Sequence, residues 1–208
     1  MKFLIIDDHA IVRKGLSQLL KEEFPDAEIV EATDEHEVYQ KTKSKIWDVI
    51  LLDISMPGRN GMDILKQLRA ENVKAPILVL SMHQEDVYGP RVLKAGANGF
   101  LNKESATEEL VAAVHKVLAG RKYISPALAE KLAEGLGDTS GKPAHELLSD
   151  REMQVMQLLA SGQTVSEIAT DLSLSVNTIS TYRNRILEKL SLNNNAELTR
   201  YAIDNSLG

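Results

Sequence analysis

The chain has 208 residues, a formal net charge of −6 and no cysteine. The lack of cysteine excludes disulfides and thiolate metal sites, and the negative charge excludes a protein that coats nucleic acid without sequence preference, because neutralising phosphates requires an excess of Lys and Arg. With 43% hydrophobic residues the chain can bury more than one core, so we expect two domains. Its apolar runs are too short to cross a bilayer and no signal peptide is recognisable, so we expect a cytoplasmic protein that does not bind membranes.

Between residues 2 and 119, short apolar runs alternate with segments of helical period, which predicts repeated βα units and a parallel sheet. The predicted strands cover residues 3–6, 28–30, 49–52, 77–80 and 99–101, and the predicted helices cover residues 10–22, 34–43, 62–71, 84–95 and 106–119. For the last helix, Ser105 and Glu108 predict a capping box at the start and Gly120 predicts the end.

The rest of the chain shows helical patterns and no strand pattern. A short helix is predicted at 126–134, a Gly-rich linker at 135–143, and four helices at 150–161, 165–172, 176–190 and 196–205. Capping boxes are predicted at Ser149 with Glu152, Thr164 with Glu167, and Asn194 with Glu197. We therefore expect one domain at 1–121, a linker with a short helix at 122–143, and an all-α domain at 144–208.

Polar residues with complementary chemistry follow the predicted strands. Asp7 and Asp8 follow the first strand, Asp53 the third, Ser81 the fourth and Lys103 the fifth. The carboxyl ends of parallel strands meet in one crevice, so these side chains are expected to converge there. Three carboxylates close together raise each other's pKa unless a hard divalent cation lies among them, and Mg²⁺ prefers such oxygen ligands.

One carboxylate of this group can act as a nucleophile. Attack by Asp53 on a phosphoryl donor gives an aspartyl phosphate, while Lys103 neutralises charge and Ser81 donates a hydrogen bond to the product. Taken singly, each residue has an ordinary explanation as a helix cap, a turn residue or a solvated charge. Together they favour the crevice, because Asp53 ends an apolar run in which a charge is costly unless it faces a functional site.

These residues resemble the receiver domain of response regulators. The matching positions are Asp7-Asp8, Asp53 followed by Met56-Pro57-Gly58, Ser81, and the run from Gly96 to Lys103. The resemblance implies an α/β, flavodoxin-like (βα)5 fold with a doubly wound parallel sheet. It also implies that Asp53 is the phosphoacceptor, that Mg²⁺ binds Asp8 and Asp53 with Asp7 behind them, and that Lys103 bridges to the phosphoryl group.

The resemblance also implies which residues bind the metal ion and which two residues change position on phosphorylation. Ser55 joins Asp7, Asp8 and Asp53 as a candidate metal residue, and Ser81 and Phe100 are the implied switch residues: Ser81 moves toward the phosphate and Phe100 rotates inward behind it. Phe100 stands where many receivers have Tyr, so its packing is retained without a hydroxyl.

Segments 165–172 and 176–190 each carry one apolar stripe and are joined by a short turn, which predicts a helix-turn-helix. From residue 143 onward there are five basic and eight acidic residues, but three of the basic ones, Arg183, Arg185 and Lys189, lie on the second of these segments. A small helical domain with a solvated polar face explains the same pattern equally well.

Longer runs at 148–152, 167–169, 174–179 and 186–190 resemble the LuxR-type helix-turn-helix, and with the receiver they resemble the NarL/FixJ group. The resemblance implies a four-helix domain whose third helix enters the major groove and whose fourth mediates pairing. We expect base contacts from Ser180, Thr181 and Asn184, and phosphate contacts from Thr178, Tyr182 and Arg185. Basic residues that many members carry at positions 180, 182 and near 166 are absent here, so the isolated domain is expected to bind DNA weakly and to need dimerisation.

The resulting expectation is a transcriptional regulator of a two-component system, which receives its phosphoryl group from a histidine kinase, binds promoter DNA as a dimer, and is not a turnover enzyme. Two alternatives remain. A Mg²⁺-dependent phosphohydrolase of the haloacid-dehalogenase type requires a second Asp two residues after the nucleophile, where this chain has Ser55. A DNA-binding protein that acts without phosphorylation does not require the full set of Asp, Ser and Lys residues.

Overall fold

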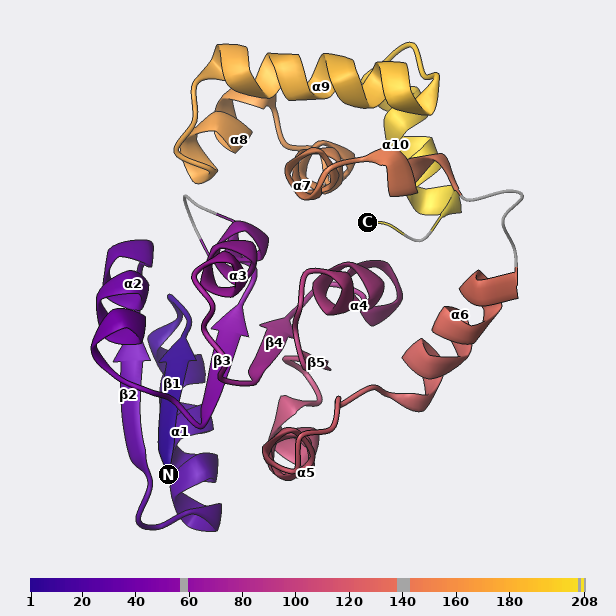
Figure 1. The fold of residues 1–208 in the computed structure, drawn as a ribbon. Coiled ribbons are helices and arrows are strands. Elements are labelled where there is room, and N and C mark those ends of the chain that lie inside the picture. The colour runs from indigo at the N-terminus through magenta and orange to yellow at the C-terminus, as the bar shows by residue number, and fades with distance from the viewer. Residues whose placement is uncertain (57–59, 138–142, 206, 208) are drawn as a thin grey trace. The chain divides into compact units, whose positions relative to one another are not determined.

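The computed structural model describes residues 1–56, 60–137, 143–205 and 207. The chain forms two compact units, Met1–Ala133 and Glu134–Gly208, which we call the N-terminal unit and the C-terminal unit (Figure 1). The division falls inside the segment predicted as a linker. Among the described residues, none of the helices combines the length and the apolar character that crossing a membrane requires.

The N-terminal unit is built on a five-stranded parallel sheet in the order β2-β1-β3-β4-β5. The strands are β1 (Lys2–Ile6), β2 (Glu28–Ala32), β3 (Val49–Asp53), β4 (Ile77–Ser81) and β5 (Gly99–Asn102). Its helices are α1 (Ala10–Glu23), α2 (Glu35–Ser44), α3 (Gly61–Ala70), α4 (Glu85–Lys94) and α5 (Ala106–Leu118), and α6 (Pro126–Gly137) begins in this unit and crosses the division at Ala133. The predicted strands and helices are confirmed, with shifts of one or two residues at most ends, and so is the flavodoxin-like fold.

Both faces of the sheet are buried, as the continuous apolar strands predict. Alternate residues such as Phe3, Leu51 and Leu80 share one core with α1 and α5. The residues between them, such as Leu52 and Val79, are equally buried against the remaining helices (Figure 1). This double cover leaves the ends of the strands as the accessible part of the sheet.

Two local predictions in the N-terminal unit are wrong. The capping box at Ser105 does not form, because the backbone there is already helical (φ −95°, ψ −4°) and the Ser105 hydroxyl donates to the Asn102 carbonyl instead. Helix α6 continues to Gly137, three residues past its predicted end, because an isolated Gly costs a helix only about 1 kcal/mol. The predicted linker residues 138–142 lie outside the described residues. Gly120 adopts φ +74°, which confirms the predicted end of α5.

The C-terminal unit consists, in its described part, of a short 3-10 helix and four α-helices: η1 (Ala144–Leu147), α7 (Asp150–Ala160), α8 (Val165–Asp171), α9 (Val176–Leu190) and α10 (Asn195–Asp204). The four predicted helices are thus confirmed. The reciprocal capping boxes of α7 and α8 are confirmed as well. At α10 the Asn194 side chain accepts from the Glu197 amide, but the Glu197 carboxylate bonds the Asn193 amide, so only half of that predicted box forms.

Candidate functional site

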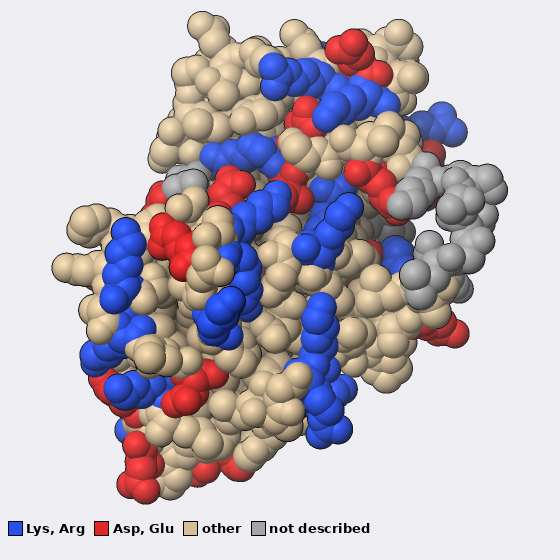
Figure 2. Space-filling view, viewed as in Figure 1, with Lys and Arg blue, Asp and Glu red and all other residues tan. Residues whose placement is uncertain are grey.

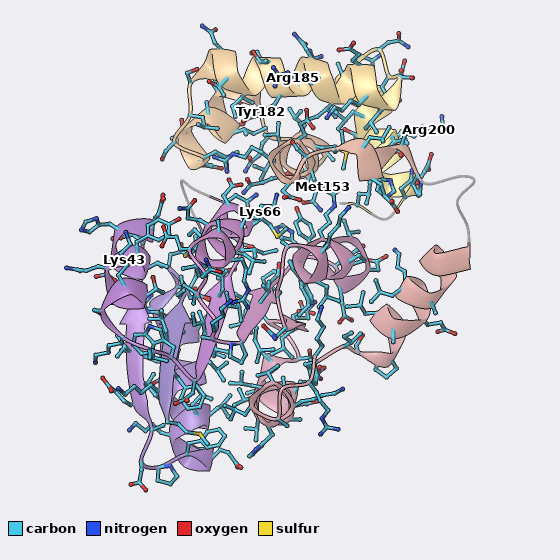
Figure 3. All side chains as sticks on the ribbon, viewed as in Figure 1. Lys43, Lys66, Met153, Tyr182, Arg185 and Arg200 are labelled. Carbon is cyan, nitrogen blue, oxygen red and sulfur yellow. The ribbon has the colours of Figure 1, made fainter. Side chains whose placement is uncertain are left out.

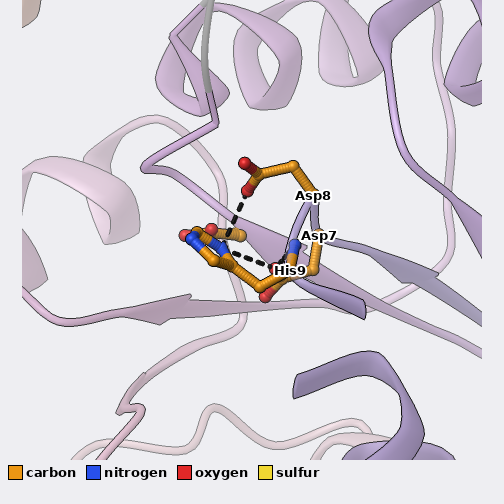
Figure 4. Close-up of side chains that lie close together, drawn as sticks. Asp7, Asp8 and His9 are labelled. Atoms are coloured by element: carbon orange, nitrogen blue, oxygen red, sulfur yellow. Dashed lines mark hydrogen bonds and ion pairs between the residues drawn. The ribbon is translucent and has the colours of Figure 1, made fainter. Parts of the chain in front are cut away.

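The predicted acidic residues meet at the carboxyl ends of neighbouring strands. Asp53 is the last residue of β3 and Asp7 follows β1, and the side chains of both are fully buried. Asp8 is partly exposed beside them. Single ligand atoms of Asp7, Asp8, His9 and Asp53 all lie within 4.8 Å of one another, and Figure 4 shows the first three of these residues. The structure therefore brings together the carboxylates that the sequence predicted to converge.

Lys103 is the cation of this cluster. Its Nζ lies 2.7 Å from Oδ2 of Asp53 and 2.7 Å from Oδ2 of Asp7. Its backbone N–H donates to the Ser81 carbonyl at 2.9 Å, which fixes the segment after β5 beside the end of β4. One ammonium thus faces two fully buried carboxylates, and the cluster keeps an excess of negative charge.

The pKa directions follow from this geometry. Burial raises the pKa of Asp53 above its usual value, against the opposing effect of Lys103 and of the Ser55 amide, which donates to Oδ1 of Asp53 at 2.8 Å. For Lys103, burial alone lowers the pKa, but the hydrogen bonds and charges of Asp53 and Asp7 outweigh it and the net shift is upward. The ammonium therefore keeps its proton at neutral pH.

The oxygen atoms of the cluster fit a hard divalent cation. Among the described residues, the buried Oγ of Ser55 makes no hydrogen bond, Oδ2 of Asp7 is paired only with Lys103, and Oδ1 of Asp8 is paired only with His9. Buried oxygens without hydrogen bonds are costly, and Mg²⁺ prefers carboxylate and other oxygen ligands. The Pro57 and Gly58 of the predicted motif lie outside the described residues.

Two residues of this site were not predicted from the sequence. His9 donates its amide to Oδ1 of Asp7 at 2.8 Å, and its Nδ1 lies 2.9 Å from Oδ1 of Asp8 (Figure 4). Arg13 on α1 donates to the carbonyl of Asp7 at 2.8 Å and to the Glu31 carboxylate. The position of His9 directly after the Asp pair was the available signal. Arg13 had none, because its contacts depend on the way α1 packs on β1.

The two predicted switch residues lie on adjacent strands. Ser81 ends β4 and is fully buried, and its Oγ accepts the His83 amide at 2.9 Å. Phe100 on β5 is 1% exposed, so its side chain is buried in the N-terminal unit.

The predicted DNA contacts lie on α9, whose outer face has a hollow of about 280 Å³ lined by Asn177, Thr178, Thr181, Tyr182 and Arg185. Tyr182 and Arg185 are marked along this helix in Figure 3. Asn177 was not among the predicted contacts, although it lies one turn before Thr181 and its carbonyl accepts the Thr181 hydroxyl. Ser180 and Asn184 were also predicted to contact DNA, but they do not line the hollow. Ser180 is half-buried and Asn184 is exposed.

Two of the three basic residues of α9 are engaged within the C-terminal unit. Nε of Arg183 donates to Oδ1 of Asn195 at 2.6 Å, and Lys189 pairs with buried Glu152 at 2.6 Å. Arg185 is exposed and lines the hollow. Figure 2 accordingly shows Lys and Arg side chains over α9 interrupted by Asp and Glu rather than one continuous basic surface.

Comparison with known proteins matches both units. Residues 3–115 match the response regulator receiver domain, and residues 146–202 match the bacterial regulatory proteins of the luxR family. The chain belongs to the response regulators that join a receiver to a LuxR-type DNA-binding domain, the NarL/FixJ type.

Individual relatives cover nearly the whole chain. The response regulator UvrY of Escherichia coli strain K12 is 32% identical over 98% of this chain and 94% of its own length. The oxygen regulatory protein NreC of Staphylococcus carnosus is 35% identical over 100% and 99%. Among solved structures, RcsB from Salmonella enterica serovar Typhimurium, bound to the promoter rprA in the presence of the phosphomimetic BeF3⁻, has a TM-score of 0.68 at 28% identity over 97% of this chain and 98% of that one.

Proposed function

We propose that this protein accepts a phosphoryl group on Asp53 from a histidine kinase and, as a dimer, binds promoter DNA through α9. The observation that carries the proposal is the fully buried Asp53 carboxylate at the end of β3, with the Lys103 ammonium 2.7 Å away. A buried charge at this place is costly, and the crevice at the ends of parallel strands is where such a fold binds ligands.

The proposed transfer uses an oxygen of Asp53 as the nucleophile. A P–O bond forms to the phosphorus of a phosphohistidine while the P–N bond breaks, and the imidazole leaves with the bonding electrons and takes up a proton. Lys103 lies close enough to neutralise charge on the phosphoryl oxygens, and Ser81 has a hydroxyl to donate to the product. The protein is thus an acceptor that is phosphorylated once in each signalling cycle, not a turnover enzyme.

Mg²⁺ is the proposed cofactor, with Asp8 and Asp53 as direct ligands and Asp7 and Ser55 next to them. When bound, the cation neutralises the excess carboxylate charge and stabilises negative charge on the transferring group. The fit rests on the convergence of the Asp7, Asp8 and Asp53 carboxylates and on the buried Oγ of Ser55, which makes no hydrogen bond with described residues.

On the DNA side, the proposal places Thr178, Thr181, Tyr182 and Arg185 at the duplex, joined by Asn177, because these five residues line one hollow. Ser180 and Asn184 remain proposed contacts at its edge. Dimerisation is proposed because α9 offers few free cations. Linking two DNA-binding domains that each bind weakly raises the affinity of the pair for a site with two half-sites. Solved RcsB structures include one described as two RcsB dimers bound to two parallel DNAs.

Phosphorylation is tested with a radiolabelled small phosphodonor and Mg²⁺. Asp53→Asn is expected to abolish incorporation, while Asp26→Asn, which neutralises an exposed aspartate outside the cluster, is expected to label as the wild type does. Wild-type labelling of Asp53→Asn overturns the assignment of the nucleophile.

DNA binding is tested by gel-shift titration on a promoter fragment at fixed salt. Arg185→Ala is expected to weaken binding, and Lys43→Ala, which removes an equal charge from α2 of the N-terminal unit, is expected to leave it unchanged (Figure 3). Equal affinities for Arg185→Ala and Lys43→Ala contradict the placement of α9 at the duplex.

A further inference from the structure

The guanidinium of Arg183 joins α9 to the start of α10. Its Nε donates to Oδ1 of Asn195, the first residue of α10, at 2.6 Å, and its Nη1 donates to Oδ1 of Asn184 in a longer bond of 3.3 Å. The bond to Asn195 is partly buried, whereas Asn184 is exposed. A guanidinium is planar and holds its donors in a fixed geometry, so the anchor at Asn195 also fixes the direction in which Nη1 meets Asn184.

This contact orients the side-chain amide of Asn184. Such an amide has an oxygen that only accepts hydrogen bonds and an NH₂ group that only donates them. Because Oδ1 of Asn184 is turned toward Arg183, Nδ2 is the group left for another molecule. Within the described part of the chain, Nδ2 of Asn184 donates to no acceptor. Asn184 therefore offers two hydrogen-bond donors at the surface of the helix that is proposed to contact DNA.

The orientation of the Asn184 amide decides which base it recognises. Asn recognises adenine with both halves of its amide, since the oxygen accepts from N6 while the NH₂ group donates to N7. Guanine presents two acceptors in the major groove, O6 and N7. An amide whose oxygen is held by Arg183 loses half of the adenine contact and keeps the donors that guanine requires.

We propose that Arg183 sets the base specificity of this protein by holding Asn184 in the orientation that selects guanine. The inference rests on the proposed DNA binding through α9. Nδ2 of Asn184 donates to O6 or N7 of one guanine in each half-site, and Arg183 acts through Asn184 rather than on a base of its own. Arg183 is thus a positioning residue, and its effect appears in the choice of base.

Selection from random DNA by the full-length protein, treated with acetyl phosphate and Mg²⁺, tests this proposal. The half-site position that Asn184 reads is the one whose base preference is lost in Asn184→Ala. At that position we expect guanine, bound about fivefold or more tightly than adenine in duplexes that differ only there. We call this ratio of affinities the guanine preference. Adenine at that position, or identical sites for the wild type and Asn184→Ala, overturns the proposal.

Two variants of α9 separate positioning from charge. Arg183→Met keeps the apolar stem but frees the Asn184 amide to turn toward adenine, so the guanine preference is expected to disappear. Arg185→Met removes an equal charge from the same helix and is expected to weaken binding to every duplex while the guanine preference stays. A guanine preference that survives Arg183→Met, or that falls equally in both variants, contradicts the positioning role.

Two further variants test whether Arg183 acts through its two partners. Asn195→Ala removes the anchor on α10 without changing Arg183 and is expected to lower the guanine preference. Adding Arg183→Met to Asn184→Ala is expected to change the base preference no further, and a further change overturns the proposal. Thermal unfolding followed by helical circular dichroism identifies the folded variants, and Asn195→Ala replaces Arg183→Met in the comparison if the latter unfolds.

The proposed DNA binding and the proposed role of Arg183 fail separately. A wild-type protein that enriches no sequence overturns DNA binding through α9 and the base specificity with it. A wild-type protein that enriches a defined site, at which Arg183→Met and Asn195→Ala keep the guanine preference, overturns the role of Arg183 while DNA binding stands.

Discussion

Replacing Glu152 by Gln isolates the contribution of one ion pair to the stability of the C-terminal unit. Glu152 is 3% exposed, and its Oε2 accepts the Ser149 amide at 2.7 Å and the Lys189 ammonium at 2.6 Å. Gln keeps the shape and an oxygen for the Ser149 amide but loses the charge. A hydrogen bond between charged groups contributes about 1.5–3 kcal/mol, and the 38% exposure of Lys189 reduces the expected loss to about 1–2 kcal/mol.

Urea unfolding separates this effect from the rest of the chain. Trp47 is the one tryptophan and lies in the N-terminal unit, so its fluorescence reports that unit, while helical circular dichroism reports both. If the free energy of unfolding of the C-terminal unit falls by about 1 kcal/mol per M of urea, the midpoint of its transition is expected to fall by about 1–2 M. The transition reported by Trp47 is expected to stay unchanged. Glu167→Gln, at the same position of the exposed capping box of α8, is the control and is expected to change little.

The pH dependence of the stability difference between the wild type and Glu152→Gln tests this reasoning. Burial alone raises the pKa of Glu152, but the bonds from Lys189 and Ser149 outweigh it, so the net pKa is lowered. A carboxylate with a lowered pKa contributes stability that is fully present above its unfolded value, about 4.3, and lost as the pH falls through its folded value. The advantage of the wild type over Glu152→Gln must therefore vanish at acid pH. A difference that persists there, or one that equals the Glu167→Gln control, refutes the reasoning.

Four further substitutions have expected outcomes. Gly120→Ala is expected to cost about 1 kcal/mol in thermal unfolding because of its positive φ, whereas Gly15→Ala in α1 is expected to stabilise by about 0.4–1 kcal/mol. Lys103→Met is expected to slow labelling of the protein by a small phosphodonor, and an unchanged rate contradicts its role. Asp8→Asn is expected to weaken Mg²⁺ binding in calorimetric titration, and an unchanged affinity removes it as a ligand.

The acidic site could be predicted from the sequence because strand ends converge whatever the details of packing. The run Val49–Asp53 ends in a charge, and a parallel sheet places that charge at the same edge as the residues that follow β1 and β5. Arg13 could not be predicted, since the reach of a long side chain from α1 to the Asp7 carbonyl depends on the orientation of the helix.

The residues of α9 that are proposed to contact DNA were harder to predict for a related reason. The helical period places Arg183, Arg185 and Lys189 on one helix but does not say which of them are held internally. Arg183 is bound by Asn195 at the start of α10, and Lys189 by Glu152 of α7. Both partners are distant in sequence, so only the packed unit identifies Arg185 as the free cation of the three.

The first residues after α5 also affect the outer edge of the sheet. β5 is a terminal strand, and the backbone of Tyr123 pairs with it through the Gly99 bridge and a bond from its amide to the Asn98 carbonyl at 2.8 Å. Unpaired strand edges are templates for association with other chains. A fragment ending at residue 121 would expose this edge and also the surface at Gly89 of α4 on which buried Leu128 packs, and it would be expected to self-associate through surfaces that the longer chain covers. A fragment ending at residue 133 keeps both surfaces covered and is the better choice for measuring receiver dimerisation.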